Sequence, residues 1–364
     1  MRLIKGILLF LNILAVLALV FVKIGSLINP NTFVLLAYAS LGLFPFLIIN
    51  IGFILFWALF RKWYFLISLA AVILFSSTVK SAFPVNFAKP EIDTTLQKIT
   101  LLSYNTMNTG MMKKHKPDKP NKVIQYILDS DADIVCLQEF AVSKNESQFQ
   151  EDDMERIFKK YPYKHIGFQL INKWNMDLGV ATFSKFPIVK KKNIDFKADY
   201  NMSIFSDIVI GKDTLRVINN HLESNRITAQ DMKKTSDLRS DFSSEKLSAA
   251  TKYLSRKLSL AYKVRANQAV KISEIIKKSP YKVISCGDFN DVPASYTYVK
   301  TKGNLKDAFK ESGNGTGWTF DHQLYRFRID YIMYDNTFLS NNFKKGKLKS
   351  SDHYPISADI YLPK

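Results

Sequence analysis

Acidic residues are missing from the first 80 positions of this 364-residue chain, which carry only six charges, all positive. This excludes a solvated globular domain there and is typical of a membrane segment, because charged side chains are costly in hydrocarbon. Apolar runs at about 4–22, 33–60 and 63–78 predict three transmembrane helices, since roughly 20 apolar residues cross a bilayer. One or two spans are the alternative, because Pro45 interrupts the middle run.

Cysteine is almost absent as well, with Cys136 in DIVCLQE and Cys286 in VISCGDF as the two examples. Both lie in apolar runs typical of buried strands, where a thiol behaves as a small hydrophobic group. We expect two unpaired core thiols, although neighbouring strands can bring such residues together. No cysteine or histidine spacing matches a zinc site, which excludes zinc-based chemistry of the common kinds.

The basic residues of the first segment predict its orientation. Arg2 and Lys5 precede the first apolar run, and Arg61 and Lys62 fill the turn before the third. The positive-inside tendency places these residues in the cytoplasm. Three spans then put the chain after Lys80 on the extracytoplasmic side, whereas two spans leave it inside.

The remainder of the chain is strongly basic. Of the 51 Lys and Arg residues, 45 follow the first 80 positions, against 32 Asp and Glu, which gives a net charge of +13. Such a charge favours anionic partners, including nucleic acid, phospholipid headgroups and other phosphate esters. The alternative is a solubilising surface beside an anionic bilayer.

A polar linker at 81–96 separates the anchor, residues 1–80, from one large domain, residues 97–364. The domain alternates strand-like and helix-like runs, which predicts an α/β or α+β fold. Residues 223–261 are rich in Lys, Ser and Asp and predict a helical insertion. Helices are expected at about 119–130, 243–258 and 262–278. Strands are expected at 98–104, 133–137, 178–183, 203–210, 214–220, 281–286, 329–334 and 356–361.

Polar residues stand at the ends of six of these apolar strands. Taken singly, each is a turn residue or a surface carboxylate. Together, oxygen ligands and two histidines that converge in one cleft suit Mg²⁺ or Mn²⁺ and phosphate chemistry better than zinc. The residues are Asn105, Gln138 and Glu139, His221, Asp288 and Asn290, Asp330, and Ser351, Asp352 and His353.

The order of these motifs resembles that of the endonuclease/exonuclease/phosphatase superfamily, which includes deoxyribonucleases, apurinic endonucleases, neutral sphingomyelinases and inositol-polyphosphate 5-phosphatases. The resemblance covers about residues 97–364. It implies a four-layered α/β/β/α sandwich of the deoxyribonuclease-like type, with a metal-dependent phosphoesterase site at one rim. The motifs are SYNTMN, IVCLQE, NNHLES, SCGDFND, RIDYIMY and SDHYPI.

The resemblance also implies a metal site. Asn105 and Glu139 match the family positions that hold the divalent cation, and Asp352 matches an acidic neighbour at that cation. We therefore expect Mg²⁺ or Mn²⁺ as the cofactor.

Catalytic roles are implied in the same way for five residues. Asp288 and Asn290 match the pair that orients the attacking water and contacts the phosphate. Asp330 matches the carboxylate that pairs with the general base, His353, and His221 matches a second histidine. An imidazole fixed by a carboxylate is well suited to deprotonate water near neutral pH.

The expected function is divalent-metal-dependent hydrolysis of a phosphate ester by water activated by His353. A membrane-tethered phosphodiesterase of the nuclease type, acting on DNA or RNA, is the first hypothesis, and the basic charge supports it. A phospholipid or sphingomyelin phosphodiesterase, or a phosphatase of the same fold, is the alternative, which the anchor and the insertion suit. An inactive binding or scaffold protein is the third. The sequence does not indicate an oligomeric state.

Overall fold

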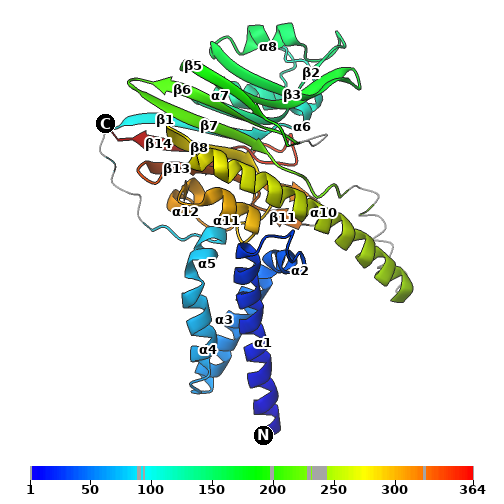
Figure 1. Ribbon diagram of the computed structural model, residues 1–364, viewed down its shortest axis with the longest axis vertical. Helices are drawn as coiled ribbons and strands as arrows, with labels where there is room; N and C mark the ends of the chain where they lie inside the picture. Colours follow the sequence, from blue (N-terminus) through cyan, green and yellow to red (C-terminus); the bar gives the residue numbers. More distant parts are fainter. Residues whose placement is uncertain are drawn as a thin grey trace. The chain divides into compact units, whose positions relative to one another are not determined.

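The computed structural model divides into two compact units, which are described separately (Figure 1). We call them the anchor unit and the sandwich unit. The anchor unit contains Met1–Val79, Glu223–Lys271 and Ala294–Thr301. The sandwich unit contains Lys80–Leu222, Ile272–Pro293 and Lys302–Lys364. The structure describes residues 2–87, 92, 95–196, 201–227, 231, 244–322 and 325–363.

The apolar N-terminal runs form helices. The stretches Arg2–Leu27 and Leu35–Leu59 are long and apolar enough to cross a membrane, which supports a membrane protein. A third span is present if the two helices Phe65–Leu74 and Ser76–Ala82, which are bent by 68° at their junction, act as one. The helices are α1 (Arg2–Leu27), α2 (Leu35–Tyr38), η1 (Ala39–Gly42), α3 (Leu43–Leu59), α4 (Phe65–Leu74) and α5 (Ser76–Ala82).

Pro45 does not end the middle run. It lies in the first turn of α3, where its missing N–H costs no helical hydrogen bond. The 3₁₀ turn of η1 comes immediately before α3 and connects it to α2.

Buried polar side chains join α1, α3 and α4 inside the anchor unit. Asn12 Nδ2 donates to Ser68 Oγ over 2.6 Å, and Ser68 Oγ donates to Asn50 Oδ1 over 2.8 Å. Trp57 Nε1 donates to Asn12 Oδ1 over 2.9 Å. Hydrogen bonds of this kind hold helices together where no hydrophobic driving force between helices is available. They make α4 part of the same bundle as the two longer helices.

Residues 244–277 form one continuous helix, α10 (Ser244–Lys277), rather than the two helices expected at 243–258 and 262–278. No Gly or Pro interrupts this stretch, so nothing in its backbone stops the helix. Within the anchor unit, Tyr38 OH donates to the carbonyl of Ser255, and Asn31 Nδ2 donates to Asn267 Oδ1 over 3.0 Å. Most of the predicted insertion before α10, at 228–230 and 232–243, lies outside the described residues.

The sandwich unit contains two six-stranded sheets and the short hairpin β10–β11 (Phe320–His322 and Tyr325–Phe327). The order in the first sheet is β13 (Leu339–Lys345), β14 (Ile356–Leu362), β1 (Gln97–Asn105), β2 (Ile134–Ser143), β4 (Met176–Ser184) and β3 (Tyr163–Lys173). The order in the second sheet is β5 (Ile188–Ile194), β6 (Ser203–Ile210), β7 (Asp213–His221), β8 (Lys282–Asp288), β12 (Asp330–Tyr334) and β9 (Lys306–Asp307).

The two sheets pack face to face around one apolar core. Ile99 and Cys136 of the first sheet and Val217 and Cys286 of the second are fully buried in it. Both cysteines are free, as the sequence predicted. The cross-sheet contact of alternating apolar residues is the packing typical of a β-sandwich.

Helices cover the outer faces of both sheets. On the first sheet, α7 (Lys122–Asp129) and α8 (Glu151–Ile157) bury Ile124 and Met154. On the second, Ile272 at the C-terminal end of α10 packs against Ile218 and Val283. The predicted α/β/β/α sandwich is therefore confirmed. Among the described residues, the remaining short helices are α6 (Met107–Met111), α11 (Tyr296–Lys302) and α12 (Ala308–Ser312).

Candidate active site

The polar residues at the strand ends pair with one another across neighbouring strands of each sheet. In the first sheet, β1 and β2 run parallel and pair Asn105 with Gln138. In the second, the parallel pair β7 and β8 sets His221 opposite Asp288, and antiparallel β12 sets Asp330 opposite Asp288 as well. The register therefore carries residues that are far apart in sequence to one end of the sandwich.

Unusual backbone conformations accompany these residues. Glu139 has a φ of 47° and falls where the pairing of β2 with β4 shifts register, between Leu137 and Phe140. Asn290 has a φ of 52°. Gly287 has a φ of 124°, and a Cβ at this position would lie 2.1 Å from the carbonyl oxygen of Asn220. Left-handed backbone at non-glycine residues is strained and concentrates at functional sites.

Two carboxylates from different sheets share the same neighbours. Asn105 Nδ2 lies 3.2 Å from Glu139 Oε1 and donates to Asp288 Oδ2 over 3.0 Å. His221 Nε2 lies 3.8 Å from each of these carboxylate oxygens. Asp288 is 1% exposed, whereas the side chain of Glu139 keeps 31% of its surface open to solvent. Glu139 is thus the more accessible of the two carboxylates to solvent, and Asp288 is buried.

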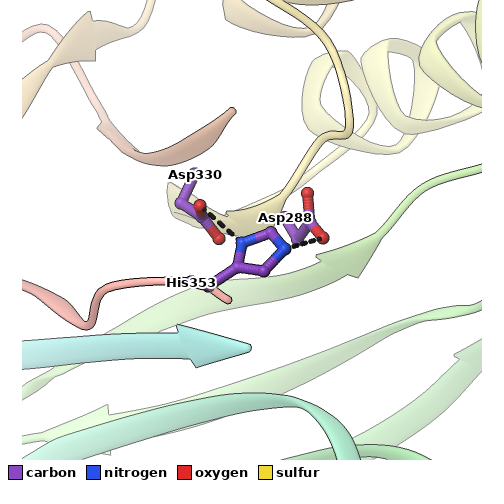
Figure 2. Close-up of side chains that lie close together, drawn as sticks. All are labelled: Asp288, Asp330 and His353. Carbon is purple, nitrogen blue, oxygen red and sulfur yellow. Dashed lines mark hydrogen bonds and ion pairs between the residues drawn. The ribbon is translucent and has the colours of Figure 1, made fainter. Parts of the chain in front are cut away.

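His353 lies between two carboxylates, as Figure 2 shows. Its Nδ1 is hydrogen-bonded to Asp330 Oδ2 at 2.9 Å, and its Nε2 lies 3.6 Å from Asp288 Oδ2. All three side chains are buried. The bond to Asp330 fixes the imidazole ring and leaves Nε2 as the nitrogen that faces the rest of the site.

The backbone around His353 is fixed by the segment before β12. Phe320 and His353 form an antiparallel bridge, and the N–H of Tyr354 donates to the carbonyl of Thr319 over 2.6 Å. Thr319 Oγ1 also accepts the N–H of Asp330 over 3.1 Å. One threonine therefore positions both members of the His353–Asp330 pair, a role the sequence analysis missed. Its position in GTGWTF, residues 315–320, which precedes RIDY at 328–331 by seven residues, was the available signal.

Asn290 and Asp352 complete the predicted set but are held differently. Asn290 donates through its backbone N–H to Asp288 Oδ1 over 2.8 Å, and its Nδ2 donates to the carbonyl of Leu222 over 2.9 Å. Asp352 accepts a 3.3 Å hydrogen bond from Ser351 Oγ, which also donates to the carbonyl of Asn105 over 2.9 Å. The negative charge of Asp352 contributes to raising the pKa of Glu139 and of His353.

Burial and neighbouring charges shift the pKa values of several side chains in the site. Burial lowers the pKa of His353, but the charges of Asp330 and Asp288 outweigh it and raise that pKa to about 10. Burial raises the pKa of Asp288 and of Glu139 and lowers the pKa of His221. Without a cation, the imidazolium of His353 is therefore the main positive charge that compensates these carboxylates.

Comparison with known protein families gives the identity of the fold. The family model described as "Endonuclease/Exonuclease/phosphatase family" matches residues 102–353, a range that includes every residue of the site. The chain belongs to this family. A second match, to a domain of unknown function, covers residues 5–82, the apolar helices. No curated protein sequence matches the chain.

Several solved structures are similar to this chain. An endonuclease/exonuclease/phosphatase from Beutenbergia cavernae is 14% identical, with 73% of this chain and 72% of that chain covered and a TM-score of 0.50. Sphingomyelinase C from Streptomyces griseocarneus is 17% identical, with 72% and 99% covered and a TM-score of 0.46. TDP2 from D. rerio, complexed with a single-strand DNA product, is 16% identical, with 73% and 100% covered and a TM-score of 0.47. The likeness to the Beutenbergia cavernae structure, at 14% identity, shows the fold alone.

The donor set of this endonuclease/exonuclease/phosphatase domain fits a hard divalent cation. Glu139 and Asp288 each have an oxygen close to Asn105 Nδ2 and His221 Nε2. Asp330 Oδ1 is buried without a hydrogen-bond partner among the described residues. Asp288, Asp330 and His353 also place one ligand atom each within 4.8 Å of one another. Carboxylate oxygens are the ligands that Mg²⁺ and Mn²⁺ prefer. Asn105 turns its amide nitrogen toward the carboxylates, so holding a cation would require its oxygen there instead.

Proposed function

We propose that the chain is a membrane-tethered, divalent-metal-dependent phosphodiesterase of the nuclease type. The observation that supports this most directly is His353, held by Asp330 at Nδ1 and facing Asp288 at Nε2. Family membership supports hydrolysis of a phosphate ester, and the net charge of +13 after the anchor supports a polyanionic substrate.

In this proposal, Asp288 and the side chain of Asn290 orient a water molecule toward phosphorus. His353 Nε2 takes a proton from that water as its oxygen bonds to phosphorus, and the bond from phosphorus to the leaving oxygen breaks. The leaving oxygen then takes a proton from solvent. His221, whose pKa is lowered by burial, is neutral near pH 7 and donates one hydrogen bond to the phosphoryl oxygens.

A cation would be held by Glu139 and Asn105, with Asp352 nearby, and would neutralise the charge that develops on the phosphoryl group. Its positive charge would also oppose the two carboxylates that raise the pKa of His353. We therefore expect the neutral imidazole, which a general base requires, to be favoured only in the metal-loaded enzyme. Asp330 holds the ring in place in either state.

The detergent-solubilised full chain tests this function. A chromogenic phosphodiester, plasmid DNA and single-stranded RNA are each incubated with Mg²⁺, with Mn²⁺ and with a chelator. Cleavage of the diester and of nucleic acid that the chelator abolishes is the expected result. No turnover of any substrate in either metal would contradict the proposed function and favour a scaffold role.

A lipid phosphodiesterase is the second candidate, because the anchor unit ties α10 to the loop that follows α1. Such a tie can hold an enzyme against a bilayer. Sphingomyelin vesicles in the same assay separate the two candidates. Turnover of sphingomyelin without cleavage of DNA or RNA would favour the lipid substrate.

We also propose that the sandwich unit lies on the extracytoplasmic side, with α4 and α5 acting together as the third span. The basic residues Arg2, Lys5, Arg61 and Lys62 support this orientation. A reporter enzyme that is active only outside the cytoplasm, fused after Lys364, is expected to be active. A reporter of the cytoplasmic type that is active at the same position would indicate two spans.

A further inference from the structure

Six of the sixteen residues that line a cavity of about 800 Å³ in the sandwich unit are lysines. The cavity lies between the segment that leads from α6 to α7 and the loop before His353. Asp118 is the one acidic residue among its lining residues. The lysines are Lys113, Lys114, Lys116, Lys119, Lys122 and Lys349.

One wall of this lysine cavity is a left-handed turn. Every residue from Met107 to Met112 has a φ between 46° and 64°, a conformation that costs a non-glycine residue roughly 1–2 kcal/mol. Hydrogen bonds maintain it: Asn121 Nδ2 donates to the carbonyls of Thr109 and Lys113 over 3.0 and 2.7 Å. The N–H of Ala141 donates to Thr109 Oγ1 over 2.8 Å. The turn is thus held firmly against β2.

Both walls of the lysine cavity lead directly to the active site. The left-handed turn follows Asn105, and Lys349 and Ser350 precede Ser351. Ser351 Oγ joins the two segments by donating to the carbonyl of Asn105 over 2.9 Å. Lys349 is three residues from Asp352, so their Cα atoms are at most about 11 Å apart.

The charge of the lysine cavity is largely uncompensated. Among the described residues, Lys114 is the one of the six lysines that forms an ion pair, 3.9 Å from Asp153 Oδ2. Lys113, Lys116, Lys119, Lys122 and Lys349 are exposed. A surface with several unpaired ammonium groups and one carboxylate attracts a ligand that carries several negative charges.

We propose that the lysine cavity binds the backbone phosphates of a nucleic acid strand beside the scissile phosphate. This inference rests on the proposed function and assigns its substrate class. Each strand of a DNA duplex carries a phosphate at about every 3.4 Å of helix axis. Because Lys349 of the cavity lies only three residues before Asp352, lysines of the cavity are placed to contact phosphates next to the scissile one. Lysine contacts to phosphates provide affinity and position without reading the base sequence.

The lining residues argue against a phosphocholine headgroup. Such a headgroup has one phosphate and a quaternary ammonium, which proteins hold over aromatic rings. None of the residues that line the cavity is aromatic, and six ammonium groups would repel the headgroup nitrogen. A headgroup with several phosphates shares the chemistry of nucleic acid and is the competing ligand in the test.

The test compares two triple variants of the detergent-solubilised full chain. The cavity variant carries Lys116→Gln, Lys119→Gln and Lys122→Gln. The control variant carries Lys190→Gln, Lys191→Gln and Lys192→Gln, which removes the same charge from three exposed lysines on β5. Both are assayed with a 20-nucleotide single strand and with a chromogenic diester that has one phosphate. The salt dependence of KM is measured for the strand.

In the cavity variant, kcat/KM for the strand is expected to fall roughly tenfold more than kcat/KM for the chromogenic diester. The slope of log KM against log salt concentration should decrease by about 2, because each lost phosphate contact on a single strand accounts for about 0.7. The control variant is expected to keep the parental values for both substrates.

Three results would overturn the inference. The first is equal kinetics of the cavity and control variants on the strand. The second is a loss confined to vesicles that contain a bisphosphorylated inositol lipid, which would assign the cavity to a headgroup. The third is a parental enzyme that cleaves the diester but not the strand. A parental enzyme that is inactive on every substrate would instead contradict the proposed function itself.

Discussion

Asp330 Oδ2 lies 2.9 Å from His353 Nδ1, although 23 residues separate the two in sequence and neither residue is more than 4% exposed. The antiparallel register of β12 with β8 fixes Asp330, and the bridge to Phe320 fixes His353. The pairing of β12 with β8 and the bridge between Phe320 and His353 therefore hold the two residues next to each other. Its geometry predicts that the two residues act as one unit.

Replacing His353 by alanine is expected to lower kcat by a factor of roughly 10²–10⁴, the usual contribution of a positioned general base. Asp330→Asn should lower kcat less, because the imidazole remains. Since Asp330 acts through His353, the double variant should be no slower than His353→Ala alone. Steady-state rates on a chromogenic diester measure all three, with thermal unfolding as the control for folding. Near-parental rates of His353→Ala would exclude it as the base.

Glu139→Gln is expected to raise the Mg²⁺ concentration that gives half-maximal rate by roughly 10–100-fold, as for other losses around a metal site. The physical reason is the loss of a charged oxygen that shares neighbours with Asp288. Rates are titrated against Mg²⁺ and Mn²⁺. Glu146→Gln, the same change at an exposed residue, is the matched control. An unchanged metal requirement in Glu139→Gln would place the cation elsewhere.

The strand and helix patterns predicted an α/β or α+β domain, and the family resemblance implied the sandwich. Most residues of the candidate site were found because strand ends carry a local signal. An apolar run followed by Asn105, His221 or Asp288 can be recognised in the sequence without the structure. The edge strand β5 was not predicted, because four of its seven residues, Lys190 to Asn193, are polar and exposed and give no apolar alternation. The uninterrupted length of α10 was missed for a related reason, since its apolar periodicity is weak.

Contacts between segments that are far apart in the chain could not be predicted from the sequence. Thr319 positions Asp330 and the segment of His353 through a hydroxyl and a carbonyl, and neither leaves a periodic pattern. The lysine cavity could not be predicted either. The sequence shows the lysines at 113–122, but only the fold brings Lys349 beside them. Asp352 was predicted beside the cation, and that role remains a prediction.

Stability should decrease in mild acid because of His165. Its Nδ1 and Nε2 lie 3.0 Å from Ser206 Oγ and 3.2 Å from Asn193 Oδ1. Burial lowers its pKa in the folded chain below the ordinary value near 6.5. The unfolded chain then binds more protons at this residue as the pH falls below about 6.5, so the free energy of unfolding falls until the folded-state pKa is passed.

Thermal unfolding of the detergent-solubilised chain at pH 7.5 and 5.5 measures this effect. His165→Gln keeps hydrogen-bonding capacity but cannot titrate, so we expect a smaller difference in Tm between the two pH values. The comparison isolates His165 from the histidines of the active site, which both proteins share. An equal difference in Tm would show that His165 does not contribute to the acid sensitivity.

The polar network of the anchor unit should stabilise its helix bundle. Asn12→Leu removes the hydrogen bond that Asn12 Nδ2 donates to Ser68 Oγ and the one that Asn12 Oδ1 accepts from Trp57 Nε1. It leaves the indole N–H of Trp57 without this acceptor in an apolar environment. Interhelical hydrogen bonds in membranes contribute roughly 0.6 kcal/mol on average and up to about 2 kcal/mol, so we expect a loss of about 1–2 kcal/mol. Titration with SDS in mixed micelles measures the free energy of unfolding. Ile13→Leu, at a neighbouring position that is 42% exposed, is the control and should be neutral. If Asn12→Leu is equally neutral, α4 is held in the bundle by apolar packing alone.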